Sequence, residues 1–209
     1  YFGRDNYINP TKNLNLILSE EHNVFIGSNC LFSFDIWFRN ADPHLVYSTE
    51  TNMRINPTKS IYVGDHVWVG QSVIVLKGSK IHSGSIIGAM SLIAGKEILS
   101  NESWGGNPIQ RIASNITWSK ECVHRWTETK SKKYEQLTSR TYIYKSSSKD
   151  YIDFDWIENE LTSRESAFEK SEFLKDLSEN RSKNRFAKSA VKKKSLVKRI
   201  KQKLAKLKF

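Results

Sequence analysis

The stretch SIYVGDHVWVGQSVIVLKGSKIHSGSIIGAMSLIA, residues 60–94, carries an aliphatic residue at every sixth position. A helix repeats at about 3.6 residues and a strand at about 2, so neither element alone produces an interval of six. A small or β-branched residue follows four positions after most of these aliphatic residues, and glycine recurs nearby. The aliphatic positions are Val63, Val69, Val75, Ile81, Ile87 and Ile93. The second positions are Val67, Val73, Ser79, Ser85 and Ser91.

This period predicts a parallel β-helix built from hexapeptide repeats. Each hexad forms one short strand, three hexads complete a triangular coil, and the aliphatic side chain points into the prism. Residues 63–98 contain six hexads and therefore two coils, which stack about 4.8 Å apart as strands do in any sheet. An earlier fragment, Ile26–Leu31 followed by Phe32 and Phe38, continues the same interval with larger side chains.

The β-helix is expected to span residues 1–112 with one interruption. The hexad phase breaks between about residues 42 and 60, which indicates a loop that protrudes from the coil. Loops held by a rigid scaffold often carry function. Turn residues at Gly105-Gly106-Asn107-Pro108 close the repeat. The fold class is therefore mainly β, with a protruding loop.

Residues 113–209 are expected to form a separate, largely helical extension. Past Ile112 the composition shifts to Lys, Glu, Ser and aromatic residues. Helices are predicted over residues 153–177 and 186–208, while residues 117–144 are compatible with helix or strand. Three tryptophans are expected to pack the extension onto the coil or onto a neighbouring subunit. They are Trp118, Trp126 and Trp156.

The formal charge of +11 is concentrated at the end of the chain, where residues 180–209 hold thirteen Lys or Arg and no Asp or Glu. Three interpretations of this basic tail are open. It lies on an anionic membrane surface, where each cation is worth about 1 kcal/mol; it attracts an anionic acceptor polymer; or it is a packing helix with a solvated face. Nucleic acid is less favoured, since no recognition motif accompanies the charge. The tail's apolar stripe is Val197, Ile200, Leu204 and Leu207.

The sequence contains no apolar run of about 18 residues, the length at which a membrane-spanning helix becomes a candidate. It shows no secretory leader, and its two cysteines do not suggest a disulfide framework. We therefore expect a cytoplasmic protein, with the inner face of the membrane as a further location if the basic tail binds lipid.

Four short motifs follow one another along the coil: Ala41-Asp42-Pro43-His44, Arg54-Ile55-Asn56-Pro57, the hexad region Val63–Gly70, and Gly106-Asn107-Pro108. In this order they resemble the hexapeptide-repeat acetyltransferases of the maltose, galactoside and xenobiotic branch. Within that group the sequence is most similar to O-acetyltransferases of bacterial surface polysaccharides. The resemblance covers residues 23–111, about two fifths of the chain.

The resemblance implies a homotrimeric left-handed β-helix with active sites between subunits, acetyl-CoA as acyl donor, and a sugar hydroxyl of a bacterial surface polysaccharide as acceptor. The basic tail favours an acidic capsular polysaccharide as that acceptor. By the same resemblance His44 is the general base, and an imidazole with a reference pKa of about 6.5 suits that role. Trp68 is expected beside the thioester and the acceptor, or at the subunit interface. Asp42 either orients the imidazole or stabilises the turn before Pro43.

The resemblance also assigns the contacts to CoA. Gln71, just past the tryptophan hexad, is the expected backbone donor to the oxyanion. Ala89, within Gly88-Ala89-Met90-Ser91, is expected to meet the pantetheine arm, and Ala94 is expected to contact CoA. Arg111 is expected to reach the phosphates, and Lys96 is either a phosphate ligand or solvated surface.

A zinc enzyme is a rival on the same fold, because carbonic anhydrases built on it bind the metal with three histidines. His44, His66 and His82 are the candidates here. His66 stands third after its aliphatic residue and His82 first after its own, so they should not converge on one ion at about 2.0–2.1 Å. We expect no metal. Acetylation of a small molecule and a non-catalytic glycan-binding or membrane-binding scaffold are the alternative functions, and N-acetylation is open beside O-acetylation.

Overall fold

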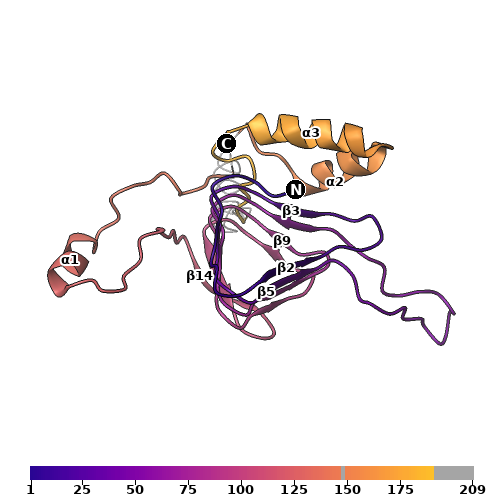
Figure 1. Cartoon of the computed structure of the whole chain (residues 1–209), viewed down its shortest axis with the longest axis horizontal. Coiled ribbons are helices and arrows are strands. Elements are labelled where there is room, and N and C mark those ends of the chain that lie inside the picture. Colours follow the sequence, from indigo (N-terminus) through magenta and orange to yellow (C-terminus); the bar gives the residue numbers. More distant parts are fainter. Residues whose placement is uncertain (147–148, 191–209) are drawn as a thin grey trace, which may run out of the picture.

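The computed structural model describes residues 1–146 and 149–190. Its strands form the three sides of a triangular prism, which Figure 1 shows in the centre of the molecule. Successive strands join the three sheets in turn, so the predicted parallel β-helix is confirmed. Sheet A contains β3 (Val24–Ile26), β6 (Ile61–Val63), β9 (Lys80–Ile81) and β12 (Glu97–Ile98). Sheet B contains β1 (Tyr7–Ile8), β4 (Leu31–Phe32), β7 (Trp68–Val69), β10 (Ile86–Ile87), β13 (Glu102–Gly105) and β14 (Gln110–Ser114). Sheet C contains β2 (Leu14–Ile17), β5 (Ile36–Arg39), β8 (Ile74–Leu76) and β11 (Leu92–Ile93).

The predicted aliphatic positions fill the inside of the prism. All six are fully buried, and so are Phe32 and Phe38, which extend the columns of sheets B and C upstream. The serines at the second position donate hydrogen bonds to carbonyl oxygens of the preceding turns. For example, the hydroxyl of Ser85 donates to the carbonyl oxygen of His82 at 2.7 Å, and that of Ser91 donates to Gly88 at 2.7 Å.

The strand register locates the insertion. Val63 pairs with Ile81, 18 residues on, which is one coil, whereas Ile26 pairs with Val63, 37 residues on. The difference of 19 residues is the predicted loop, which projects from one corner of the prism in Figure 1. The last coil is one residue short, since Ile81 pairs with Ile98. The sixth hexad predicted from the sequence is therefore a pentad.

The corners of the prism need backbone with positive φ. We name them by the sheets they join: the A/B corner at residues 64–67 and 82–85, the B/C corner at 70–73 and 88–91, and the C/A corner at 77–79 and 94–96. Glycine supplies this conformation at Gly84, where φ is 80° and an added Cβ would lie 2.6 Å from the ring of Tyr144. Positive-φ residues other than glycine at these corners include His66, Ser72 and Met90.

The extension packs against the outer face of sheet A. Phe25 and Tyr62 point outward from that sheet, yet both are buried because the extension covers them. The covering elements are α2 (Phe154–Ser163) and α3 (Ala167–Glu179), which lie together above the prism in Figure 1. The residues of the extension that join this second core are Phe154, Ile157, Leu161, Leu177 and Phe186.

Several predictions for the extension require correction. The single helix predicted over residues 153–177 is two helices, because Arg164 is extended and Ser166 starts a new helix with a capping box to Glu169. The next predicted helix does not begin at Phe186, since residues 186–190 are not helical. The rest of that helix and the apolar stripe of the basic tail lie outside the described residues.

The ambiguous region 117–144 is mostly irregular. It contains one short helix, α1 (Glu128–Lys133), on a long excursion away from the prism in Figure 1. Of the three tryptophans expected to pack the extension onto the coil, Trp118 does so, and the other two pack on rings of the extension itself. Trp118 is buried against the coil, Trp126 packs on Tyr134 within the excursion, and Trp156 packs on Phe173 between α2 and α3.

Candidate functional site

The protruding loop is a hairpin tied together by one asparagine. Asn56 accepts a hydrogen bond from the N–H of Val46 at 2.9 Å and donates to the carbonyl oxygen of His44 at 2.8 Å. Farther out, Tyr47 and Arg54 form an antiparallel bridge. The Arg-x-Asn-Pro motif therefore has a structural role, which is to set the backbone around His44.

The base of the hairpin is fastened to the first coil. Arg54 forms two hydrogen bonds with the carboxylate of Glu20, at 2.7 and 3.1 Å, and the hydroxyl of Thr58 donates to the same carboxylate. These bonds, with that from Arg54 first, lower the pKa of Glu20 to about 2. The returning side of the loop is thus held against the first coil although the loop lies outside the repeat.

Asp42 links the hairpin to the coil. Its Oδ2 accepts hydrogen bonds from Lys77 Nζ at 2.6 Å and from Asn56 Nδ2 at 3.1 Å. The bond from Lys77, followed by that from Asn56, lowers the pKa of the Asp42 carboxyl. Of the two roles left open for Asp42, these contacts support the fastening of the turn; an interaction with the imidazole of His44 stays a prediction. The side chain of His44 is exposed.

A groove of about 400 Å³ lies beneath the hairpin at the C/A corner. Its lining combines Asp42 of the loop with Ala94, an expected CoA contact. It also includes three cations, Arg39, Lys59 and Lys77. The buried Nε of Arg39 has no hydrogen-bond partner among the described residues. Sequence reasoning missed these cations, because nothing in the hexad pattern marks them as neighbours of the loop.

The other predicted site residues lie at different places on the prism. Trp68 begins β7 on sheet B and is 38% exposed, with Trp118 beside it at 5.9 Å between ring centroids. Gln71 and Ala89 stack at the B/C corner, where the N–H of Met90 donates to the carbonyl oxygen of Gln71 at 2.9 Å, and both side chains are exposed.

The two predicted phosphate ligands differ in their availability. Lys96 is exposed at the C/A corner, above the groove that contains Ala94. Arg111 is half-exposed on β14 and donates to the buried carboxylate of Glu102 at 3.1 Å, which also accepts the indole N–H of Trp104. A phosphate would therefore share Arg111 with Glu102.

Within one chain, then, the predicted residues form two groups separated by the width of sheet C. His44, Asp42 and Ala94 belong to the C/A corner, while Gln71 and Ala89 belong to the B/C corner. The structure brings Asp42 and Ala94 to one groove and does not bring His44 to Trp68.

The two other histidines considered as metal ligands hold the extension. The ring of His66 stacks between Trp118 and Tyr142, at 3.9 and 3.6 Å between centroids. His82 contacts the carbonyl oxygen of Phe186 at 3.2 Å and the carboxylate of Glu97 at 3.0 Å. Among the described residues, no three His, Cys, Asp or Glu side chains gather as a metal site.

Comparison with known proteins identifies relatives of this architecture. The chain is 30% identical over 109 residues to a polysialic acid O-acetyltransferase of Neisseria meningitidis, covering 52% of this chain and 51% of the relative. It is 35% identical over 104 residues to a polysialic acid O-acetyltransferase of Escherichia coli O1:K1, covering 50% of this chain and 34% of the relative. The chain thus spans about half or less of the length of these curated relatives. No family model matches it.

The solved structures agree with this relationship. The crystal structure of the polysialic acid O-acetyltransferase OatWY superposes with a TM-score of 0.51 at 28% identity, covering 59% of each chain. The fold is accordingly the left-handed parallel β-helix that the motifs imply. Among the described residues, no helix has the length and apolar character needed to cross a membrane. By its hexads, its histidine hairpin and these relatives, the chain is similar to hexapeptide-repeat acetyltransferases, among them the polysialic acid O-acetyltransferases.

Proposed function

We propose that this protein transfers an acetyl group from acetyl-CoA to a sugar hydroxyl of an acidic capsular polysaccharide. One observation carries the proposal: the His44 hairpin is anchored over a basic groove whose wall includes Ala94. The two polysialic acid O-acetyltransferases among the relatives supply the acceptor class. Polysialic acid carries one carboxylate per sugar, which suits a groove with three cations and a single carboxylate.

In the proposed reaction His44 acts as general base. Its imidazole takes the proton of the acceptor hydroxyl while that oxygen attacks the carbonyl carbon of the thioester. The tetrahedral oxyanion then collapses, the carbon–sulfur bond breaks, and the thiolate of CoA takes up a proton. A positioned base of this kind contributes about 10²- to 10⁴-fold to the rate. The N–H of Gln71 is the proposed donor to the oxyanion.

The separation of the two residue groups favours assembly of the site from more than one copy of the chain. His44 and Asp42 leave from the C/A corner, whereas Trp68, Gln71 and Ala89 line sheet B and the B/C corner. A second copy that presents its B/C corner to the hairpin of the first would complete the set. We propose a homotrimer, with each cleft formed by two neighbouring subunits.

Donor binding is assigned to the exposed turns of the later coils. Ala89 and Ala94 have exposed side chains too small to block the approach of a pantetheine arm to the backbone. Lys96 and Arg111 are the proposed phosphate contacts, the latter with only part of its guanidinium available beside Glu102. A cytoplasmic location, where acetyl-CoA is abundant, belongs to the same proposal.

The test is release of free thiol from acetyl-CoA with polysialic acid as acceptor. We would compare the wild type with His44→Ala and with His124→Ala, an exposed histidine of the excursion that serves as matched control. Free N-acetylneuraminic acid and a neutral dextran are the comparison acceptors. Turnover that requires the polymer and falls at least about 10²-fold only in His44→Ala is the expected result.

The other outcomes are informative as well. Undiminished turnover in His44→Ala would contradict the mechanism. Turnover with the monosaccharide but not with the polymer would replace the acceptor class with a small molecule. Bound acetyl-CoA without transfer to any acceptor would favour a scaffold rather than an enzyme.

A further inference from the structure

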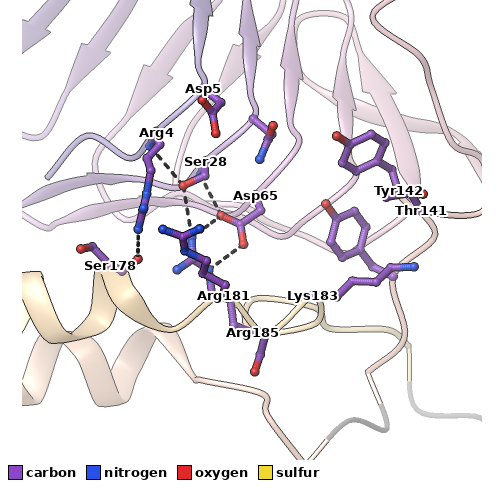
Figure 2. Close-up of a pocket in the computed structure, with 13 residues that line it drawn as sticks. Arg4, Asp5, Ser28, Asp65, Thr141, Tyr142, Ser178, Arg181, Lys183 and Arg185 are labelled. Carbon is purple, nitrogen blue, oxygen red and sulfur yellow. Dashed lines mark hydrogen bonds and ion pairs between the residues drawn. The ribbon is translucent and has the colours of Figure 1, made fainter.

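A second cavity, of about 340 Å³, lies at the A/B corner, which is the corner not used by either group of predicted site residues. Three distant parts of the chain line it: the first coil with Arg4 and Ser28, the segment 141–144, and residues 178–185, which comprise the end of α3 and the segment after it. Figure 2 shows these side chains converging from the prism and from the extension. The cavity therefore depends on the extension and not on the hexapeptide repeat alone.

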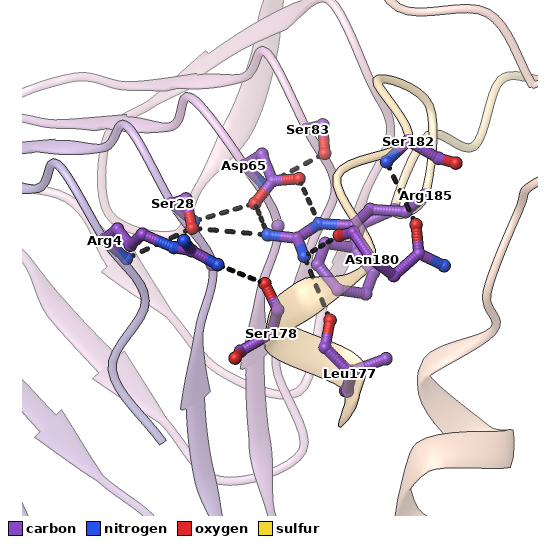
Figure 3. Close-up of polar contacts among 12 residues, drawn as sticks. Arg4, Ser28, Asp65, Ser83, Leu177, Ser178, Asn180, Ser182 and Arg185 are labelled. Carbon is purple, nitrogen blue, oxygen red and sulfur yellow. Dashed lines mark hydrogen bonds and ion pairs between the residues drawn. The ribbon is translucent and has the colours of Figure 1, made fainter. Parts of the chain in front are cut away.

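The cavity has an excess of positive charge. At its back, Arg185 and Asp65 neutralise each other through hydrogen bonds of 2.7 and 2.8 Å, drawn in Figure 3. The remaining cations face neutral groups. Arg4 donates to the carbonyl oxygen of Ser178 at 2.5 Å, and Lys183 donates to another carbonyl oxygen at 2.9 Å.

Arg181 completes this set of cations. Its guanidinium is exposed at the cavity and has no hydrogen-bond or ion-pair partner among the described residues. Apart from Asp65, the lining contains one carboxylate, that of Asp5, compared with the three cations Arg4, Arg181 and Lys183. An anion that enters would therefore meet charge that the protein itself does not compensate.

The opposite wall is aromatic and rigid. Tyr142 stacks on the ring of His66 at 3.6 Å, and the backbone of Tyr144 is held by Asn101 through hydrogen bonds of 2.8 and 3.1 Å. Ser28, Thr141 and Ser182 add hydroxyl groups to the lining. The volume is at the lower end of the range of about 300–1,000 Å³ for small-molecule sites, enough for one sugar ring.

We propose that this cavity holds one carboxylated sugar of the acceptor polysaccharide, as an anchoring site separate from the site of transfer. The identity of the acceptor rests on the proposed function. A guanidinium pairs with a carboxylate through two parallel hydrogen bonds, which Arg181 is free to offer, while Arg4 adds positive charge beside it although one of its amino groups already donates to Ser178. Tyrosine rings and hydroxyl groups suit the apolar and polar faces of a sugar. A second contact on the same polymer raises the affinity for long chains but not for single sugars.

The experiment measures, by isothermal titration calorimetry at fixed salt concentration, the binding of a trimer of N-acetylneuraminic acid to the full chain. Arg181→Gln and Lys183→Gln remove exposed charges that pair with no carboxylate, so neither should affect folding. Arg125→Gln removes an equally exposed arginine of the excursion and is the matched control. We expect each of the first two variants to weaken binding about tenfold, and the control to leave it unchanged.

A neutral dextran trimer and inorganic phosphate are the further probes. Binding of phosphate that depends on Arg181 as strongly as binding of the sugar acid does would overturn the assignment to a carboxylated sugar. Equal weakening in Arg125→Gln would reduce the effect to general charge, and unaltered binding in Arg181→Gln would remove the site.

Acetyl transfer separates this inference from the proposed function. If both hold, the Arg181→Gln variant raises KM for the polymer about tenfold and leaves kcat unchanged. Intact KM together with intact transfer refutes the anchoring site alone. Binding that depends on Arg181 without transfer to any glycan refutes the proposed function alone.

Discussion

Replacement of Arg185 by methionine should lower the free energy of unfolding by several kcal/mol, because the buried carboxylate of Asp65 loses its cation. Arg185 is 5% exposed and Asp65 8% exposed. Methionine keeps much of the apolar stem of Arg185 but leaves the Asp65 carboxylate without its cation, a change that typically costs about 3–5 kcal/mol. The carbonyl oxygens of Leu177 and Asn180 also lose their donor, at about 1 kcal/mol each if water does not replace it.

The assay is urea unfolding followed by tryptophan fluorescence, at one protein concentration because assembly shifts apparent stability. Lys132→Met breaks an exposed pair with Glu128 on α1 and should cost no more than about 0.5 kcal/mol. The double variant Asp65→Asn/Arg185→Met removes both charges, so its loss should be smaller than the sum of the two single losses. A loss below about 1 kcal/mol for Arg185→Met, or strict additivity in the double variant, would refute the reasoning.

Two further predictions concern the loop and the acid response. Lys77→Met removes the cation that fastens Asp42, so thiol release should fall about tenfold because the hairpin is misplaced. The free energy of unfolding should change by less than about 1 kcal/mol because the pair is half-exposed. Unchanged turnover would show that this contact does not position the hairpin. Burial lowers the pKa of His66 to about 4 from 6.5, so the unfolded chain binds a proton that the folded chain does not, and stability should fall by up to about 3 kcal/mol as the pH drops from 6.5 to 4. His66→Asn keeps a residue type that tolerates positive φ and should flatten this slope in unfolding curves measured across that window; an unaltered slope would assign it to other groups.

The prism could be predicted because the sequence pattern that specifies it lies within a single continuous stretch of the chain. An interval of six residues, read along a single stretch, defines which side chains point inward, and Val63, Ile81 and Ile87 are buried as expected. The position of the loop follows from the same interval, since a break in the period marks where chain leaves the coil. The location of His44 on that loop was therefore accessible without any structure.

The extension could not be predicted in the same way, because its decisive contacts join residues far apart in the sequence. Arg185 counts among the thirteen cations at the end of the chain, and by composition it belongs to a solvated basic tail. In the structure it is buried against Asp65, 120 positions earlier, and nearby Lys188 pairs with Glu97 at 2.6 Å. No periodicity connects such partners, so a count of charged residues in this segment overestimates how many of its cations are unpaired.

If the proposed function holds, the same contacts allow one prism to serve two binding tasks without conflict. A triangular coil has three corners, and an enzyme that completes its site with a neighbouring copy needs two of them exposed: the C/A corner with its hairpin and the B/C corner with its bare turns. The extension is clamped at the third corner by Asp65 and His66. It can therefore build a cavity of its own beside the first coil while leaving the edges that carry His44 and Gln71 open to a partner and to the donor. If Arg181 anchors the polymer there, the chain would hold its acceptor on one edge and modify it on another.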